Sequence, residues 1–203
     1  MTQRSKVGLA LVLLAVVGAA TAVAVLVQHG FSARDQPTAI EAFVARRLRH
    51  LAVPRSARQA KNPIPATPDV LAAARAHFAD HCASCHGNDG SGQTEIGQHL
   101  YPKAPDMRQA ATQSLSDGEL FYIIHNGVRL TGMPAWGDNL PEDDQDSWKL
   151  VHFIRHLPKI SQEELEEMKK LNPQSPQEKE EEEEEEKFLQ GDDSPAPVPQ
   201  HHH

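Results

Sequence analysis

The sequence has few of the residues that hold small proteins together. Among 203 residues there are only two cysteines, and aromatic residues make up 5%. Two cysteines cannot build a disulfide framework, and they lack the second Cys/His pair that a structural zinc site usually needs. Convincing alternation of apolar and polar residues is also missing, which argues against β-strands. These features favour an all-α protein with a small core that relies on a covalent staple or a cofactor.

Charge is unevenly distributed and divides the chain into three parts. Residues 1–67 contain nine Lys/Arg and two Asp/Glu, residues 68–160 contain seven and twelve, and residues 161–203 contain four and fourteen. Only the middle part, about ninety residues, has the composition to bury a core, and that length is near the small end for independent folding. We expect a globular domain at 68–160 and no nucleic-acid partner.

The N-terminal part contains a long apolar run. Residues 7–27 carry no charge, and a helix of that length spans about 30 Å, the thickness of a bilayer core. A cleaved signal peptide is the alternative, because Arg4 and Lys6 precede the run and small residues occur within it. Signal peptides usually have shorter apolar regions of roughly 7 to 15 residues. We therefore predict an uncleaved transmembrane anchor at 7–27. Charge leaves its orientation open, because basic residues lie on both sides of the run.

Residues 28–67 are predicted to form a basic amphipathic helix and a Pro-rich linker. Apolar residues recur at helical spacing through 38–52, with arginines mostly on the other side. Such a helix can lie in the lipid headgroup layer, or it can pack on the following domain or on a partner subunit. Residues 53–67 contain three prolines and no periodicity. As an extended linker of roughly 45 Å, they would let a tethered domain move along the membrane.

Capping residues predict three helices in the globular part. Thr67 followed by Pro68 opens the first, and Ser116 with Glu119 three residues later forms a capping box for the second. Pro141 and an acidic segment open the third. Glycine- and proline-rich loops connect them, so the class is all-α with long loops.

Both cysteines lie in the segment HCASCHG, residues 81–87. A thioredoxin-like redox pair would need a βαβ context, which the pattern lacks, and a plain disulfide stays open. The remaining interpretation is C-x-x-C-H, the c-type haem attachment motif. In it Cys82 and Cys85 form thioethers with the haem, and the next residue, His86, binds the iron. Only this interpretation uses every residue of the pentapeptide.

A haem iron bound by His86 would need two further groups from the chain, a hydrogen-bond acceptor for the imidazole and a second axial ligand. The second nitrogen of that imidazole needs a hydrogen-bond acceptor, for which we expect the carbonyl of Pro105. For the sixth iron position we favour Met133, in the loop VRLTGMPAWG, over Met107, which we expect to be a wall residue. In the same loop, Trp136 is placed to cover the haem edge.

These motifs together resemble those of class I c-type cytochromes. CASCHG, YPKAPDM, a helix ending in NGV, GMPAWG and WKLVHFIRHLP occur in that family's order within residues 68–158, under half of the chain. The resemblance implies three to five helices around one covalently attached haem c. It also implies that Cys82 and Cys85 are anchors, that His86 and Met133 are axial ligands, and that Pro105 orients His86.

The resemblance also implies a location and a role. Class I cytochromes carry their haem outside the cytoplasm, which places this domain on the periplasmic or outer face of the inner membrane, held by a single-pass anchor. The resemblance thus implies that residues 1–6 form a cytoplasmic N-terminus. Redox partners would be an oxidase, a quinol-oxidising complex or a dehydrogenase. Two further residues, Tyr101 and Arg129, are candidate hydrogen-bond donors to the haem propionates.

The C-terminal part begins with a second capping box, Ser161 and Glu164, which predicts a short helix at 161–172. Residues 173–203 include seven consecutive glutamates and a proline-rich end. This composition cannot bury enough apolar surface to order the chain, so we expect a disordered acidic tail.

Our hypothesis from the sequence is a membrane-anchored monohaem cytochrome that carries single electrons between respiratory partners. We assign no catalytic acid, base or nucleophile, and so do not expect an enzyme in its own right. A cytochrome subunit of a dehydrogenase or oxidase complex is the alternative. A haem-based sensor or a peroxidase would need an open iron position, against which Met133 argues.

Overall fold

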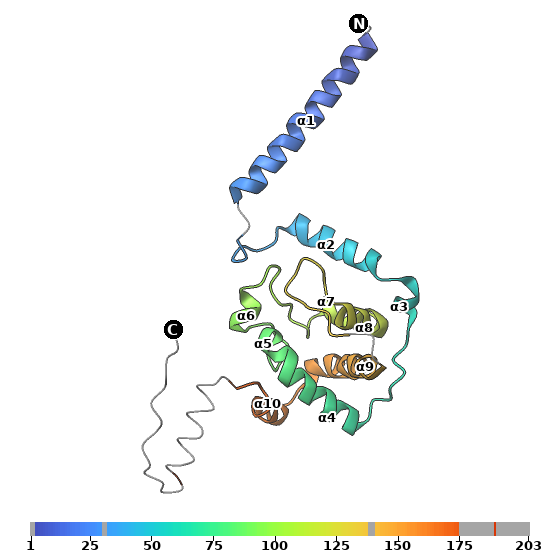
Figure 1. The fold of residues 1–203 in the computed structure, drawn as a ribbon, viewed down its shortest axis with the longest axis vertical. Helices are drawn as coiled ribbons and strands as arrows, with labels where there is room; N and C mark the ends of the chain where they lie inside the picture. Colours follow the sequence, from blue (N-terminus) through green and yellow to red (C-terminus); the bar gives the residue numbers. More distant parts are fainter. Residues whose placement is uncertain (1–2, 30–31, 138–140, 175–188, 190–203) are drawn as a thin grey trace, which may run out of the picture.

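The computed structural model describes residues 3–29, 32–137 and 141–174, together with Leu189. Every element within these ranges is helical (Figure 1), which confirms the all-α prediction. The longer helices are α1 (Gln3–His29), α2 (Ala39–Ala52), α4 (Pro68–His77), α8 (Asp117–Asn126), α9 (Pro141–His156) and α10 (Gln162–Lys169). The short elements are α3 (Arg55–Gln59), η1 (Phe78–Cys82), α5 (Ala83–His86), α6 (Glu95–Gln98), α7 (Ala110–Gln113) and η2 (Leu157–Lys159).

Helix α1 stands apart from the rest of the molecule (Figure 1). It contains the only segment of the described ranges, Gln3–Val25, that is long and apolar enough to cross a membrane by length and composition. No part of that segment is buried against the protein. The helix covers the predicted anchor and extends it by a few residues at each end.

The core of the globular part forms where α4 and α9 cross and α8 packs beside α9. At the crossing, the rings of Phe78 and Phe153 lie 4.9 Å apart between centroids, and both side chains are fully buried. Beside it, Phe121 of α8 stacks on Trp148 of α9 at 4.2 Å. Phe78 begins η1 directly after α4, so these aromatic pairs join the end of α4, α8 and α9. The capping residues of α4 and α8, Thr67 and Ser116, make the side-chain hydrogen bonds expected of them.

The structure corrects the prediction of a free linker at 53–67. Helix α3 contacts α8, because Gly118 has no side chain and lets the carbonyl of Ala57 approach closely. The Ser116 hydroxyl donates to the carbonyl of Arg58 at 2.8 Å, and the Asn62 amide donates to the carbonyl of Trp148 at 2.8 Å. The segment is thus tied along the domain by backbone carbonyls, for which hydrophobic periodicity gives no signal.

The C-terminal helix α10 lies within the interval predicted for it and docks on the domain. Met168 is fully buried in the common core. The carboxylate of Glu164 pairs with Arg75 of α4 at 3.2 Å and with His156 of α9 at 2.9 Å. The core therefore extends beyond residue 160. The predicted disordered tail, 173–203, lies outside the described residues except for 173, 174 and 189.

Candidate haem-attachment site

The two cysteines lie at the end of one nearly continuous helical path. Helix α4 passes through the π-helical turn η1 into α5, which ends at His86. Gly87 then adopts φ +73°, a left-handed conformation that side chains rarely take, and reverses the chain. Residues three apart share a helix face, so the path brings Cys82 and Cys85 to one side directly before His86.

Both thiols are free and partly buried. Burial, with a smaller contribution from the neighbouring Cys85, raises the pKa of the Cys82 thiol to about 12. Such a thiol stays protonated at neutral pH, whereas redox and nucleophilic cysteines need a stabilised thiolate. Cys82 therefore lacks the stabilised thiolate of a redox or nucleophilic cysteine.

Burial also determines the protonation state of the adjacent His86 imidazole. Desolvation lowers the pKa of His86, so the ring is held neutral, the form that binds metal ions. Its Nδ1 atom is buried and has no hydrogen-bond partner among the described residues. The predicted hydrogen bond to the carbonyl of Pro105 is therefore not formed. A buried imidazole nitrogen without a partner is costly, and it is the feature of this structure that fits an imidazole meant for ligation.

The loop that follows the motif folds back against it. The Gly92 amide donates to the carbonyl of His86 at 2.7 Å, and the Met107 amide donates to the carbonyl of Gly90 at 2.8 Å. A side chain at position 92 would collide with the backbone carbonyl of Ala104. The two ends of the loop thus meet beside His86, and only glycine fits at the point of closest approach.

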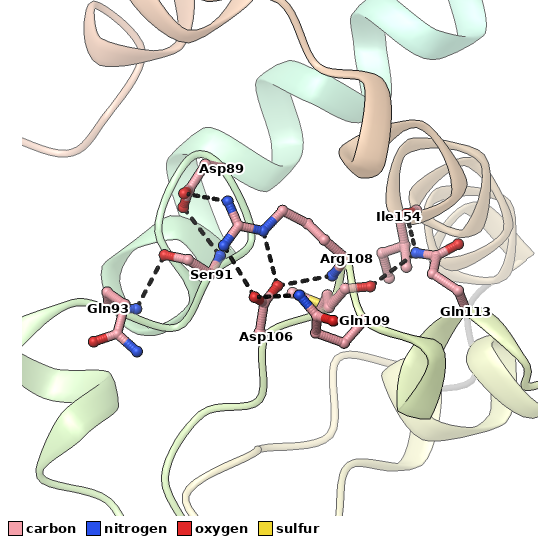
Figure 2. Close-up of polar contacts among 9 residues, drawn as sticks. Asp89, Ser91, Gln93, Asp106, Arg108, Gln109, Gln113 and Ile154 are labelled. Carbon is pink, nitrogen blue, oxygen red and sulfur yellow. Dashed lines mark hydrogen bonds and ion pairs between the residues drawn. The ribbon is translucent and has the colours of Figure 1, made fainter.

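Arg108 fastens this loop (Figure 2). Its guanidinium donates to Asp106 at 2.8 Å and to Asp89 at 2.9 Å. The hydrogen bonds from Arg108 lower the pKa of Asp106 to about 2. Asp89 in turn accepts from the amide of Ser91 at 3.0 Å. Sequence reasoning missed this cluster, because Asp89 and Arg108 are nineteen residues apart and only Asp106-x-Arg108 gave a local hint.

The structure separates the candidate methionines. Met107 is buried in the core, and its carbonyl accepts from the Gln113 side chain at 2.8 Å. Met168 is buried in the same core. Met133 instead lies half-buried in the loop between α8 and α9, where its amide is held by the Thr131 hydroxyl at 3.1 Å. Of the three methionines whose side chains are described, only Met133 is outside the core.

The remaining candidates lie in different surroundings. Trp136 packs against the core and faces the ring of His81 at 5.4 Å. Tyr101 donates its hydroxyl proton to Glu41 of α2 at 2.6 Å, so a hydrogen bond to a propionate would require it to change partners. Arg129 is exposed in the loop that carries Met133. The propionate roles of Tyr101 and Arg129 stay predictions.

Comparison with known proteins identifies this part of the chain. The family model for subunit III of cbb3-type cytochrome c oxidase matches residues 69–154, the stretch that contains α4, the attachment motif, the loops and most of α9. These residues form a c-type cytochrome domain. A c-type cytochrome domain implies haem c, and the matched residues include both free thiols and His86.

Two curated relatives match parts of this chain. The cbb3-type cytochrome c oxidase subunit FixP of Rhizobium meliloti (strain 1021) is 35% identical over 80 residues, which is 39% of this chain and 25% of the relative. Subunit FixPc of Rhizobium leguminosarum bv. viciae is 33% identical over 94 residues, 46% of this chain and 30% of the relative. The matched region thus spans under a third of the length of these relatives.

Proposed function

We propose that this protein is a membrane-anchored cytochrome that passes single electrons through one haem c to or from an oxidase complex. Cys82 and Cys85 anchor the haem, His86 and Met133 bind its iron, and α1 holds the domain at the periplasmic face of the inner membrane. The arrangement that carries the proposal is the pair of free thiols followed, at the end of one helical path, by a neutral imidazole whose Nδ1 has no hydrogen-bond partner among the described residues.

Each part of the chain has a role in this function. Haem iron supplies one-electron chemistry by alternating between its ferric and ferrous states. The buried surroundings of His86 keep its imidazole neutral and so available as a ligand. The thioether of Met133 favours ferrous iron and raises the reduction potential relative to a second histidine. The Arg108 cluster holds the loop beside His86 and so limits movement of the ligand.

The choice of an oxidase as partner rests on the relatives. Both are named as subunits of cbb3-type cytochrome c oxidases, and they are 35% and 33% identical to this chain over 80 and 94 residues. A dehydrogenase partner is the alternative, because a cytochrome domain of this kind serves either complex. Purification of the full chain from membranes, with identification of co-purifying subunits, distinguishes the two.

The first test is spectroscopic. The full chain, matured with a c-type haem assembly system, should give a pyridine haemochrome spectrum of one covalent haem and the weak far-red ferric band of iron–methionine ligation. Covalent haem without that band would favour a sensor or a peroxidase function, because the sixth coordination position of the iron would then be open. Failure to attach haem would overturn the proposal.

A matched pair of variants assigns the sixth ligand. Met133→Leu should abolish the far-red band and lower the reduction potential, because leucine offers no sulfur to the iron. Met107→Leu is the control: it replaces a buried core side chain with one of similar volume, so the band should stay. Loss of the band in the Met107 variant alone would reassign the ligand.

A further inference from the structure

The structure resolves which side of α2 faces the domain. The residues of this helix that are partly covered by the domain are Ala42 and Arg49, two turns apart on one face. The opposite face is apolar and uncovered, with exposed fractions from 46% to 77%, and consists of Ile40, Phe43, Val44, Leu48 and Leu51. We call these five residues the apolar face of α2. An amphipathic helix normally buries its apolar side against the protein, and here that side points away from it.

Polar contacts hold α2 in this orientation. Glu41 accepts the hydroxyl proton of Tyr101 at 2.6 Å, and His50 Nδ1 lies 2.9 Å from the carboxylate of Glu119, a residue that is buried at the start of α8. Val53, directly after the helix, is also buried. The two ends of α2 are therefore fastened to the cytochrome domain at separate points, and the helix cannot turn its apolar face inward without breaking both.

Helix α2 follows the membrane anchor after a short connection. Helix α1 ends at His29 and α2 begins at Ala39, so nine residues connect them. Nine extended residues reach roughly 30 Å at most. Figure 1 shows α2 along the edge of the domain from which α1 extends. When α1 spans a bilayer, α2 must therefore lie close to the membrane surface.

The charges on α2 suit an anionic lipid surface. Arg46 and Arg47 are exposed, and the Arg47 guanidinium lies 5.9 Å from the centre of the Phe43 ring. An arginine beside an apolar stripe can extend its charged end to lipid phosphates while its methylene groups stay with the apolar side chains. Each basic residue near an anionic membrane adds attraction that a neutral surface does not offer.

We propose that the apolar face of α2 inserts into the headgroup region of an anionic bilayer and thereby fixes how the cytochrome domain is oriented on the membrane. Because α2 is fastened to the loop that contains Tyr101 and to α8, its insertion holds the attachment site at one height and tilt. The proposal rests on the membrane anchor in the proposed function, but not on haem attachment.

Photo-crosslinking of the full chain tests this directly. The photoreactive residue benzoylphenylalanine replaces Leu48 on the apolar face or Leu14 in α1. As the control it replaces Ala45, on an exposed flank of α2. Each protein is reconstituted in vesicles of phosphatidylethanolamine and phosphatidylglycerol. We expect lipid adducts from positions 14 and 48 and several-fold fewer from position 45. Arg46→Gln with Arg47→Gln should reduce the adducts at 48 in these vesicles and not at 14.

Every other outcome contradicts the proposal, and two of them identify a different partner for the apolar face. Adducts at 48 with a second copy of the chain would make the apolar face a dimer contact, and adducts with another protein would make it a subunit interface. Lipid adducts at 14 with none at 48 would leave the face in water. If position 14 gives no lipid adduct, the membrane anchor itself fails, and the haem spectrum then shows independently whether the cytochrome function stands.

Discussion

Helices α2 and α10 flank the cytochrome domain, and both begin with a capping box, Thr38 with Glu41 and Ser161 with Glu164. They attach to the domain in opposite ways. Helix α10 buries Met168 in the core, whereas α2 uses polar contacts and leaves its apolar face exposed. Equivalent patterns of periodicity and capping thus lead to a core helix in one case and an outward-facing helix in the other.

The largest expected contrast comes from removing one apolar side chain from each helix. Met168→Ala should lower the free energy of unfolding by about 2 to 5 kcal/mol, because it leaves a cavity in the core. Leu48→Ala should change it by less than about 0.5 kcal/mol, since the side chain is exposed. Guanidinium unfolding of the detergent-solubilised chain, followed by tryptophan fluorescence, measures both. Similar losses would show that the two helices are attached alike.

The ion pairs of α10 predict a pH dependence. Burial alone would raise the pKa of Glu164, but hydrogen bonds from His156 and from the Ser161 amide outweigh it and lower the pKa to about 2. The stabilisation is therefore complete above the ordinary value of 4.5 and is lost as the pH falls toward about 2. Allowing for solvent screening, the loss amounts to about 1 to 2 kcal/mol.

Glu164→Gln tests the origin of that dependence. The variant should be less stable than the parent at pH 6 and should lose less stability between pH 5 and pH 3, as measured by unfolding at each pH. Glu166→Gln is the control, because Glu166 is exposed on the same helix and pairs with Lys169 of that helix. An unchanged pH profile in the Glu164 variant would show that other carboxylates cause the acid sensitivity.

The capping boxes give the smallest contrast. Ser161→Ala and Thr38→Ala each remove the hydroxyl oxygen that accepts a hydrogen bond from a backbone amide in the first helical turn, at 3.2 Å in both cases. Each substitution should cost about 1 kcal/mol of helix stability. For α10 this loss should lower the stability of the whole domain, because that helix contributes to the core. For α2 it should only speed amide hydrogen exchange within 39–52. A decrease in global stability from Thr38→Ala would show that α2 folds with the core.

Much of the site was predictable because its signals are local. The spacing of Cys82, Cys85 and His86, and the cap residues Thr67 and Ser116, act over one helical turn and need no knowledge of the fold. The cluster around Arg108 was not predictable, since it joins residues on both ends of a loop. The attachment of 53–67 was missed for the same reason: the groups that its carbonyls contact, the Ser116 hydroxyl and Gly118, lie far along the chain.

The sequence by itself determined the helical class, the attachment motif, the long apolar helix and the amphipathic pattern of α2, because composition and periodicity act within each segment. Only the tertiary structure decided which methionine stays out of the core and which face of α2 meets the domain. Both outcomes depend on which parts of the domain surface can contact a given side chain or helix. Burial sets the state of His86 in the same way, since desolvation arises only once distant segments have packed around a side chain.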